Sequence, residues 1–192
     1  MKKLFLCAAL AVFAFTSVNA QEVTFGAKAG VNLASIGGDD TDGLDSRTAF
    51  HLGVVAEIVI SEKFSVQPEL LYSAQGATES FEGIDLDLNL DYINLPIMAK
   101  YYVAEGFSIE AGPQVGFLMS AKAKAEGEEE DLKDFVKGID FGFNLGLGYK
   151  MESGLNFAAR YNLGLSNIND GEGSDDFKNQ NSVMQVSVGY MF

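Results

Sequence analysis

The chain has 192 residues, of which 13 are basic and 27 acidic, so its formal net charge is −14. An acidic surface argues against nucleic acid as a partner, because contacts to phosphate groups require lysine and arginine. The length permits a single domain.

The first 20 residues have the pattern of a secretory signal peptide. Two lysines at positions 2–3 form a basic n-region, residues 4–15 form an apolar h-region, and residues 18–20 end in a small-residue cleavage pattern. An apolar run of about a dozen residues is too short to cross a bilayer as a helix. We therefore expect cleavage after Ala20.

Cleavage would leave residues 21–192 as one exported domain. The leader holds the only cysteine, Cys7, so the mature chain has no disulfide or thiol chemistry to explain. The leader also holds two of the basic residues and none of the acidic ones, which leaves the mature chain with a net charge of −16. No mature segment has the 18 apolar residues of a transmembrane helix, so the chain is either soluble or spans an outer membrane as strands.

From Val23 onwards, apolar and polar residues alternate, which is the period-2 pattern of β-strands with one apolar face. Eight such runs follow one another at residues 23–33, 50–60, 64–73, 84–101, 107–117, 139–150, 155–165 and 183–192. Long connections follow the odd-numbered runs and short ones the even-numbered runs. In an antiparallel meander this places all long loops at one end, as in outer-membrane barrels.

Two features predict irregular strands. In the fourth run, residues 84–90 carry apolar side chains at even positions, whereas residues 93–101 carry them at odd positions. A one-residue phase change is typical of a β-bulge, so we expect this strand to project beyond the membrane and to bulge near Asp91. Prolines remove a donor from the strand ladder, so we expect local irregularity, such as bulges, at Pro68, Pro96 and Pro113.

The distribution of charge and aromatic residues predicts which face meets lipid. The apolar faces carry no charge within the strands, and a charge facing lipid at the midplane would cost about 2–4 kcal/mol. A soluble barrel would instead turn this face inward. Aromatic residues gather at both ends of the apolar faces, as in interfacial belts. They are Phe25, Phe64, Tyr101, Phe107, Tyr149 and Tyr190 near the short turns, and Phe50, Tyr72, Phe117 and Phe141 near the long loops.

Eight charged residues lie on the polar faces and are therefore predicted to point into the lumen. They are Lys28, Lys100, Lys150 and Arg160 against Glu57, Glu69, Glu110 and Asp140. The interior of an eight-stranded barrel is only wide enough for its own side chains to fill. We expect these charges to pair and fill the lumen as a structural network.

The final run ends the chain on an aromatic residue, with Tyr190 and Phe192 on its apolar face. In hydrocarbon an unpaired backbone N–H or C=O costs several kcal/mol, so an open sheet edge is not viable. The first and last strands are therefore expected to pair. The sequence predicts an all-β fold, an eight-stranded antiparallel up-and-down transmembrane β-barrel.

Four segments, 67–72 (QPELLY), 92–96 (YINLP), 110–113 (EAGP) and 160–168 (RYNLGLSNI), carry a family resemblance. The mature chain resembles the small outer-membrane β-barrel proteins of Gram-negative bacteria known as porin-family or PorT-like proteins. The resemblance implies location in the outer membrane, and prolines occur at such places in that family. Tyr190 and Phe192 look like the signal that the barrel-assembly machinery reads. The motifs are specific for fold and location, and fold does not imply activity.

Catalytic and metal sites find little support in the sequence. His51 is the only histidine, and Ser35, Ser73 and Ser166 are the serines expected to approach it, but no nucleophile motif surrounds them. We expect His51 to be a hydrogen-bonded residue of the lumen or rim. The loop acids, Asp39, Asp40, Asp42, Glu128, Glu129, Glu130, Asp175 and Asp176, offer oxygen ligands for Ca²⁺, but their spacing is not that of an EF-hand and solvated loop tips are the simpler interpretation.

Two classes of function remain, and neither requires a cofactor. The first is a monomeric, non-enzymatic barrel embedded in outer-membrane lipid that displays acidic loops to an extracellular or envelope ligand. The alternative is a narrow porin-like channel for ions or small solutes. The plugged lumen favours the first class, and the family name favours the second.

Overall fold

The computed structural model describes residues 22–192 except 40, 42, 82–83, 126–127 and 172–176. The predicted signal peptide and its cleavage site after Ala20 lie outside the described residues, as do four of the loop acids, Asp40, Asp42, Asp175 and Asp176.

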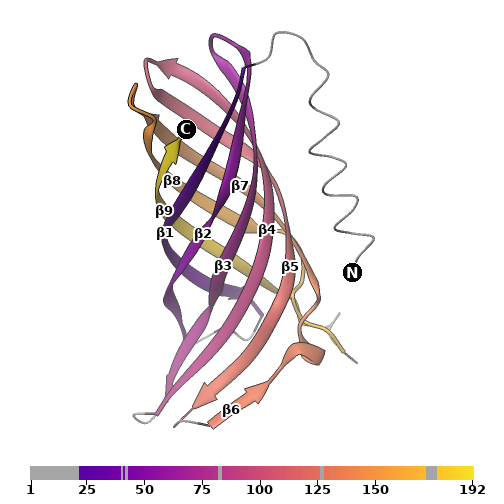
Figure 1. Ribbon diagram of the computed structural model, residues 1–192. Helices are drawn as coiled ribbons and strands as arrows, with labels where there is room; N and C mark the ends of the chain where they lie inside the picture. The colour runs from indigo at the N-terminus through magenta and orange to yellow at the C-terminus, as the bar shows by residue number, and fades with distance from the viewer. Residues whose placement is uncertain (1–21, 40, 42, 82–83, 126–127, 172–176) are drawn as a thin grey trace.

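Eight strands form a closed antiparallel ring (Figure 1), which confirms the predicted all-β barrel. They are β1 (Val23–Gly38), β2 (Leu44–Ser61), β3 (Phe64–Phe81), β4 (Ile84–Ala104), β5 (Phe107–Ala125), β7 (Ile139–Lys150), β8 (Leu155–Gly164) and β9 (Asn179–Met191). Each pairs with its neighbour in this order, and β1 pairs with β9 to close the ring. The short turns lie at the upper end of Figure 1 and the long loops at the lower end.

The strands are strongly staggered around the ring. Following the paired residues once around, from Asp140 through every strand, leads back to β7 at Lys150, ten residues along. A stagger of this kind tilts the strands against the barrel axis, as Figure 1 shows. Residues far apart in register therefore meet at one level of the lumen.

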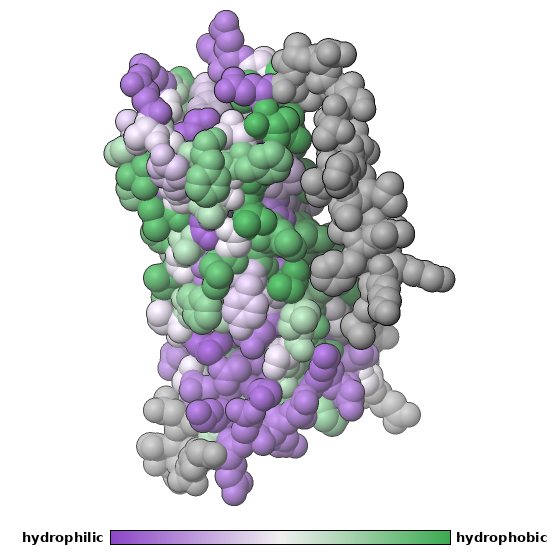
Figure 2. All heavy atoms as spheres, in the orientation of Figure 1, coloured by the Kyte–Doolittle hydropathy of each residue, from purple (hydrophilic) through white to green (hydrophobic). Residues whose placement is uncertain are grey.

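The outward face of the ring is apolar. The predicted aromatic residues Phe25, Phe50 and Tyr101 are each at least half exposed, and so are aliphatic residues between them such as Val54. Figure 2 shows hydrophobic residues over the middle of the barrel and hydrophilic residues gathered at its long-loop end. The strand faces that carry the charged residues point inward, as expected for a barrel with lipid outside.

The expected bulge in β4 near Asp91 is wrong in its location. The pairing of β3 with β4 runs without a shift past Asp91, so β4 itself is regular. A register shift does occur opposite Asp91 and Tyr92, but the extra residue is Met119 in β5. From Leu88 to Lys100 the even positions of β4 face inward, so the phase change in its sequence exchanges apolar for acidic residues on the outward face. Beyond Asp91, Leu88 and Leu90 pack into the barrel, whereas Leu86 is exposed.

The prolines interrupt pairing without bulges. Pairing of β2 with β3 is interrupted between Val55 and Ile58, opposite Pro68, and resumes in the same register. Pairing of β3 with β4 is interrupted between Pro68 and Leu71, opposite Pro96, and pairing of β4 with β5 between Pro96 and Ala99, opposite Pro113, also without a shift. The lost ladder donor therefore explains the local irregularity at each proline, and the suggestion of bulges there is wrong.

Part of the expected charged loop between β5 and β7 is ordered. β5 extends to Ala125 and forms a hairpin with β6 (Glu128–Asp131), which is followed by the short 3-10 helix η2 (Lys133–Phe135). All four residues of β6 are exposed. Within the described residues, no helix has the length and apolar character needed to cross a membrane.

Candidate functional site: the lumen

Seven of the eight predicted lumenal charges form one continuous series of ion pairs, which we call the ion-pair chain. It runs Lys28–Glu69–Arg160–Glu110–Lys100–Glu57–Lys150, with N···O distances between 2.8 and 3.6 Å. Its members come from seven different strands, β1 to β5, β7 and β8, because the stagger of the ring brings them to neighbouring levels. The eighth residue, Asp140, lies apart from it.

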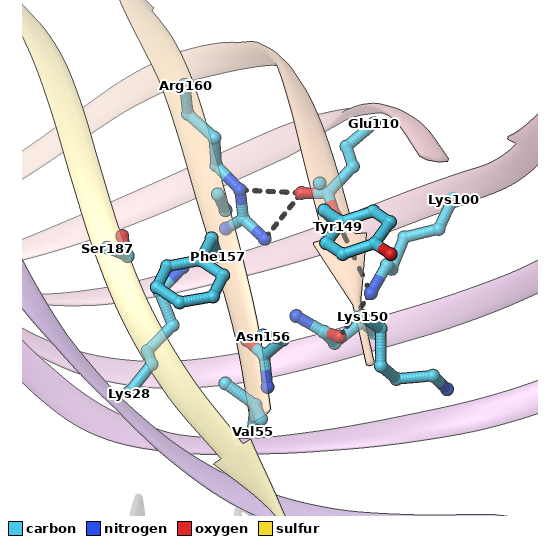
Figure 3. A pocket seen from close by; sticks show the side chains of 13 residues that line it. Lys28, Val55, Lys100, Glu110, Tyr149, Lys150, Asn156, Phe157, Arg160 and Ser187 are labelled. Carbon is cyan, nitrogen blue, oxygen red and sulfur yellow. Dashed lines mark hydrogen bonds and ion pairs between the residues drawn. The ribbon is translucent and has the colours of Figure 1, made fainter. Parts of the chain in front are cut away.

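Arg160 is the centre of the ion-pair chain. Its Nη1 contacts Glu69 Oε1 at 2.8 Å, while its Nε and Nη2 both reach Glu110 Oε2 at 2.8 Å. Figure 3 shows the guanidinium pointing to Glu110 from β8. The side chains of all three residues are at most 2% exposed. Hydrogen bonds to charged groups at such short range are the stronger kind, and burial raises the cost of breaking them.

Uncharged residues complete the partners of the carboxylates. Gln67 donates to Glu69 at 2.7 Å and accepts from Lys100 at 3.1 Å, so it links two parts of the ion-pair chain. Ser65 and Tyr102 both donate to Glu57. The ammonium groups of Lys100 and Lys150 lie 5.6 and 5.5 Å from the Tyr102 ring centre, within cation–π range. Tyr102 lies on the same face of β4 as Lys100, so the alternation pattern identifies it as a lumenal residue. A search for charged residues alone does not find it.

The short-turn end of the lumen opens into a hollow of about 280 Å³. Glu57, Tyr102 and Lys150 line its floor, and turn residues such as Glu105 and Glu152 line its rim. Lys150 is the most exposed member of the ion-pair chain, with 32% of its side chain accessible. Beyond this floor, the cavity beside Arg160 shown in Figure 3 holds only about 10 Å³, roughly the space of one water molecule.

His51 lies in the next layer of the lumen, toward the long loops. Its Nδ1 lies 2.7 Å from Asn32 Oδ1 and its Nε2 lies 2.8 Å from the Ser187 hydroxyl. An amide oxygen only accepts, so Nδ1 carries the proton and Nε2 accepts from Ser187. The sequence-based expectation of a hydrogen-bonded lumenal His51 agrees with this geometry. The serine involved is Ser187, which sequence reasoning did not consider.

The order serine, histidine and amide in this layer is that of a nucleophile, a base and its orienting group. Its surroundings differ from those of an active site. His51 and Asn32 are at most 1% exposed, and the Asn32 side chain is saturated by Phe50, Ser73, Ala74 and Gln185. The adjoining cavity has room for about one water, so an acyl substrate does not fit.

Asp140 and its neighbours form the next layer toward the long loops. Ser166 donates to the Asp140 carboxylate at 2.5 Å and accepts from the backbone N–H of Phe141 at 2.9 Å. Four polar atoms of buried side chains near this level have no hydrogen-bond partner among the described residues: Tyr92 Oη, Asn94 Nδ2, Asn162 Nδ2 and Asn181 Oδ1.

An apolar cluster closes the long-loop end of the lumen, and we call it the apolar cap. Its buried members are Ile36, Ala77, Leu90, Tyr92, Leu118, Ala121 and Ile168, with Leu44, Leu88, Leu132 and Val136 packed against them. Leu90 and Ala121 have no accessible surface. The sequence signal for this cap was the phase change in β4, which was attributed to a bulge instead of an inward-facing apolar set.

The acidic loops carry no recognisable calcium site in the part of the chain that the structure describes. No group of three or more His, Cys, Asp or Glu residues there is arranged to hold a metal ion. Glu129 of β6 pairs with Lys122 of β5, and this hydrogen bond together with the charge of Glu129 raises the pKa of Lys122. The Glu129 carboxylate therefore stabilises the exposed hairpin of β5 and β6.

Comparison of the sequence with protein families gives one match. The profile of the family described as outer membrane protein beta-barrel domain matches residues 19–170. No curated protein shows significant sequence similarity to the chain.

Solved structures share the fold at low sequence identity. Ail, the attachment invasion locus protein of Yersinia pestis, is 17% identical, with a TM-score of 0.56, over 89% of this chain and 99% of Ail. Neisserial surface protein A is 12% identical, with a TM-score of 0.58, over the same shares. A major outer membrane protein from Thermus thermophilus is 13% identical, with a TM-score of 0.52, over 89% of this chain and all of that one. These likenesses concern the fold alone.

Proposed function

Since the chain belongs to the outer membrane protein beta-barrel family and lies in the outer membrane, we propose that it is a non-conducting, non-enzymatic barrel that acts through its long-loop end. The observation that carries this proposal is the filling of the lumen. From the short turns toward the long loops, the interior holds the ion-pair chain, the layer of His51, and the apolar cap.

Ion conduction requires a continuous path of water, and two features of the lumen oppose one. The charges of the ion-pair chain are engaged with one another and are not presented to a passing ion. The apolar cap has fully buried members, Leu90 and Ala121, at the point that an ion would have to cross. Hydrophobic constrictions exclude water and so close pores.

A narrow channel remains the second candidate, because one observation favours it. The hollow of about 280 Å³ at the short-turn end leads to a polar lumen, which is the lining that a conduit for ions requires. A channel would need the apolar cap to open, since the cap is the only layer without polar side chains among the described residues other than the hydroxyl of Tyr92.

Single-channel recording in a planar bilayer separates the two candidates. The refolded barrel is first shown to be folded by its heat-modifiable migration on a gel, and a 16-stranded porin with an aqueous channel serves as the positive control. Silence from the verified barrel supports the proposal. Reproducible open steps would refute it and establish the channel.

The charge of the long-loop end indicates which ligands fit. All four acidic residues of β6 are exposed, and the mature chain is strongly acidic. One structure of Ail holds a heparin analogue, sucrose octasulfate, which is a polyanion. An acidic surface repels a polyanion and complements a basic or neutral partner. Immobilised heparin at low salt should therefore fail to bind the barrel in lipid nanodiscs, and salt-sensitive binding of heparin would contradict this assignment.

Three further proposals concern biogenesis and assembly. Residues 1–20 serve as a cleaved leader, which N-terminal sequencing of the mature protein tests.

Tyr190 and Phe192 are recognised by the barrel-assembly machinery. Phe192 follows β9 directly and is 78% exposed, and its ring centre lies 5.7 Å from that of the exposed Tyr190, so both are available to an assembly factor. The barrel acts as a monomer, which light scattering in detergent tests.

A further inference from the structure

Two lysines lie beside the wall of the barrel at its long-loop end. Lys133 begins η2, and Lys137 lies two residues before Ile139, the first residue of β7. Figure 1 shows β6 beside β5 at this end and the chain turning back from it to β7. Neither lysine forms an ion pair with a residue that the structure describes. They differ in this from the lumenal lysines and from Lys122, each of which has a carboxylate partner.

The segment before β7 continues the wall of the barrel. Leu118 of β5 donates its backbone N–H to Gly138 O at 3.0 Å, so the pairing of the wall extends past the end of β7. Successive side chains of an extended segment point to opposite faces. Val136 packs against the apolar cap on the inside, and Ile139 is exposed on the outside. The side chain of Lys137 therefore points outward.

Both lysines lie at the level where the outward face changes from apolar to charged. Lys137 is the next outward residue beyond the lipid-facing Ile139, at most about 7 Å along the chain. Lys133 Nζ donates to the backbone oxygen of Met119 at 3.1 Å, and Met119 directly follows the β5 residue that pairs with Gly138. The headgroup layer is about 5–8 Å deep beyond the hydrocarbon. The two ammonium groups are therefore at the height of the lipid headgroups.

Exposed apolar side chains accompany the two lysines. Phe135, between them in the sequence, is 63% exposed, and Met119 is 54% exposed. Large apolar side chains are unfavourable in water, whereas aromatic rings are enriched at the interface of a membrane. Contact with lipid accounts for the apolar and the charged residues together. We call Met119, Lys133, Phe135 and Lys137 the boundary cluster.

The charge of the boundary cluster selects the kind of headgroup. Two ammonium groups have six N–H donors, and among the described residues only the oxygen of Met119 occupies one of them. A phosphate group offers several acceptor oxygens and a negative charge, so it forms strong hydrogen bonds with such donors. A zwitterionic headgroup also carries a cation, which the two lysines repel. The cluster therefore fits a lipid whose headgroup has a net negative charge.

The acidic residues nearby leave the lysines available. Asp131 Oδ1 accepts the backbone N–H of Lys133 at 2.9 Å, and this contact does not involve the ammonium group. The carboxylates of β6 are exposed, and they repel a polyanion that arrives from water. The boundary cluster faces sideways into the headgroups instead. A lipid that diffuses within the membrane reaches it without passing β6.

We propose that the boundary cluster binds one lipid of the outer leaflet through a phosphate of its headgroup. The phosphate accepts hydrogen bonds from the ammonium groups of Lys133 and Lys137, and Phe135 and Met119 contact the apolar part of the same lipid. This interaction goes beyond the proposed surface role. A barrel that conducts ions would bind the lipid in the same way, so the failure of one proposal leaves the other standing.

Native mass spectrometry tests the binding directly. The barrel is reconstituted in phosphatidylcholine nanodiscs that contain a minor share of phosphatidic acid and is then released into the gas phase. The proposal predicts that one phosphatidic acid stays bound to each barrel. Equal retention of the two lipids would overturn it. Displacement of the phosphatidic acid by excess inorganic phosphate would also overturn it, because the site would then be one for free phosphate.

Two double variants locate the site. Lys133→Gln with Lys137→Gln removes both ammonium groups of the boundary cluster. Lys63→Gln with Lys178→Gln removes the same charge from exposed lysines in a short turn and in a long loop. None of the four lysines is buried or ion-paired among the described residues, so both variants should fold, which heat-modifiable migration on a gel checks.

A titration of phosphatidic acid into the nanodiscs then compares the variants. A lysine near an anionic membrane surface strengthens binding about fivefold, so the loss of both lysines of the boundary cluster should weaken it about 25-fold. The control variant should bind as the wild type does. Equal weakening in both variants would reduce the effect to net charge, and unchanged binding without Lys133 and Lys137 would place the lipid elsewhere. Either result would refute the assignment.

Discussion

Replacing Arg160 with alanine is the sharpest test of the ion-pair chain. The guanidinium makes three charge-assisted contacts of 2.8 Å, one to Glu69 and two to Glu110. Its removal leaves the two carboxylates with unequal partners. Glu69 keeps Lys28 at 3.1 Å and Gln67 at 2.7 Å, whereas Glu110 keeps only Lys100 at 3.5 Å and Ser108 at 3.3 Å.

The size of the effect follows from the burial of these groups. Removing one partner of a buried ion pair costs about 3–5 kcal/mol, since the remaining charge stays desolvated. Because Arg160 serves two carboxylates and Glu110 is left with long contacts, we expect the Arg160→Ala variant to lie within that range. Such a loss corresponds to a shift of roughly two to four orders of magnitude in the unfolding equilibrium.

The assay is reversible denaturant unfolding in lipid vesicles, followed by far-ultraviolet circular dichroism and by heat-modifiable migration on gels. Tryptophan fluorescence cannot report, because the chain has no tryptophan. A matched double variant, Arg160→Met with Glu110→Gln, removes one charge of each sign. It leaves Glu69 paired with Lys28 and Lys100 paired with Glu57, and should recover most of the lost stability. Wild-type stability in the Arg160→Ala barrel would refute the reasoning, and so would a double variant less stable than the single one.

Other substitutions probe the remaining layers. Lys150→Ala should cost only about 1 kcal/mol in the same unfolding assay, because Lys150 is a third exposed at the mouth and water compensates the loss. Leu90→Ala in the apolar cap should cost about 2–5 kcal/mol, as for other buried leucines, and a near-neutral result would mean that the cap is loosely packed. A fluorophosphonate probe should leave Ser187 unlabelled in the folded barrel, since the adjoining cavity admits about one water; labelling that His51→Ala abolishes would reveal a hydrolase. Deletion of Phe192 should slow insertion by the reconstituted assembly machinery without lowering the stability of the folded barrel, and unchanged insertion kinetics would argue against a role in recognition.

The sequence predicted the strands well, and also which face of each strand points outward, because both depend on the local alternation of apolar and polar residues. Residues such as Phe50 and Val54 alternate with His51 and Val55, and in the structure the first pair is exposed and the second pair buried. Closure was equally predictable, because hydrocarbon leaves no alternative for the backbone of an edge strand.

The partners of the lumenal residues could not be predicted in the same way. Lys28 meets Glu69 across 41 residues, and His51 meets Ser187 across 136. Such pairs depend on the stagger of the whole ring, which no single run encodes. The β6 hairpin was missed for a different reason. Its four consecutive acidic residues lack both alternation and strand propensity, and only pairing with β5 orders them.

The long-loop end shows how one strand can meet two solvents. Where lipid surrounds the barrel, apolar side chains point outward; where water surrounds it, they must point inward to be buried. In β4 the sequence makes this switch. Its backbone stays regular past Asp91, and on the long-loop side apolar residues such as Leu90 occupy the positions that point inward. β5 achieves it in its backbone. Apart from the buried Leu118, its apolar residues keep odd positions from Phe107 to Ala125, and the extra residue Met119 turns Ala121 inward.

Both devices occur at one level, because Asp91 and Tyr92 lie opposite the bulge at Met119. This coincidence has a physical reason. Suppose that β4 exchanged its apolar and polar faces and β5 had no bulge. On the long-loop side of this level, the inward side chains of β4 would then face Lys122 and Lys124 of β5 in the lumen, where these two charges would have no partners. The bulge instead places Ala121 inward beside Leu90 and leaves Lys122 outside to pair with Glu129. The phase change in the sequence and the bulge in the structure therefore mark the same boundary, the surface where the barrel leaves the membrane.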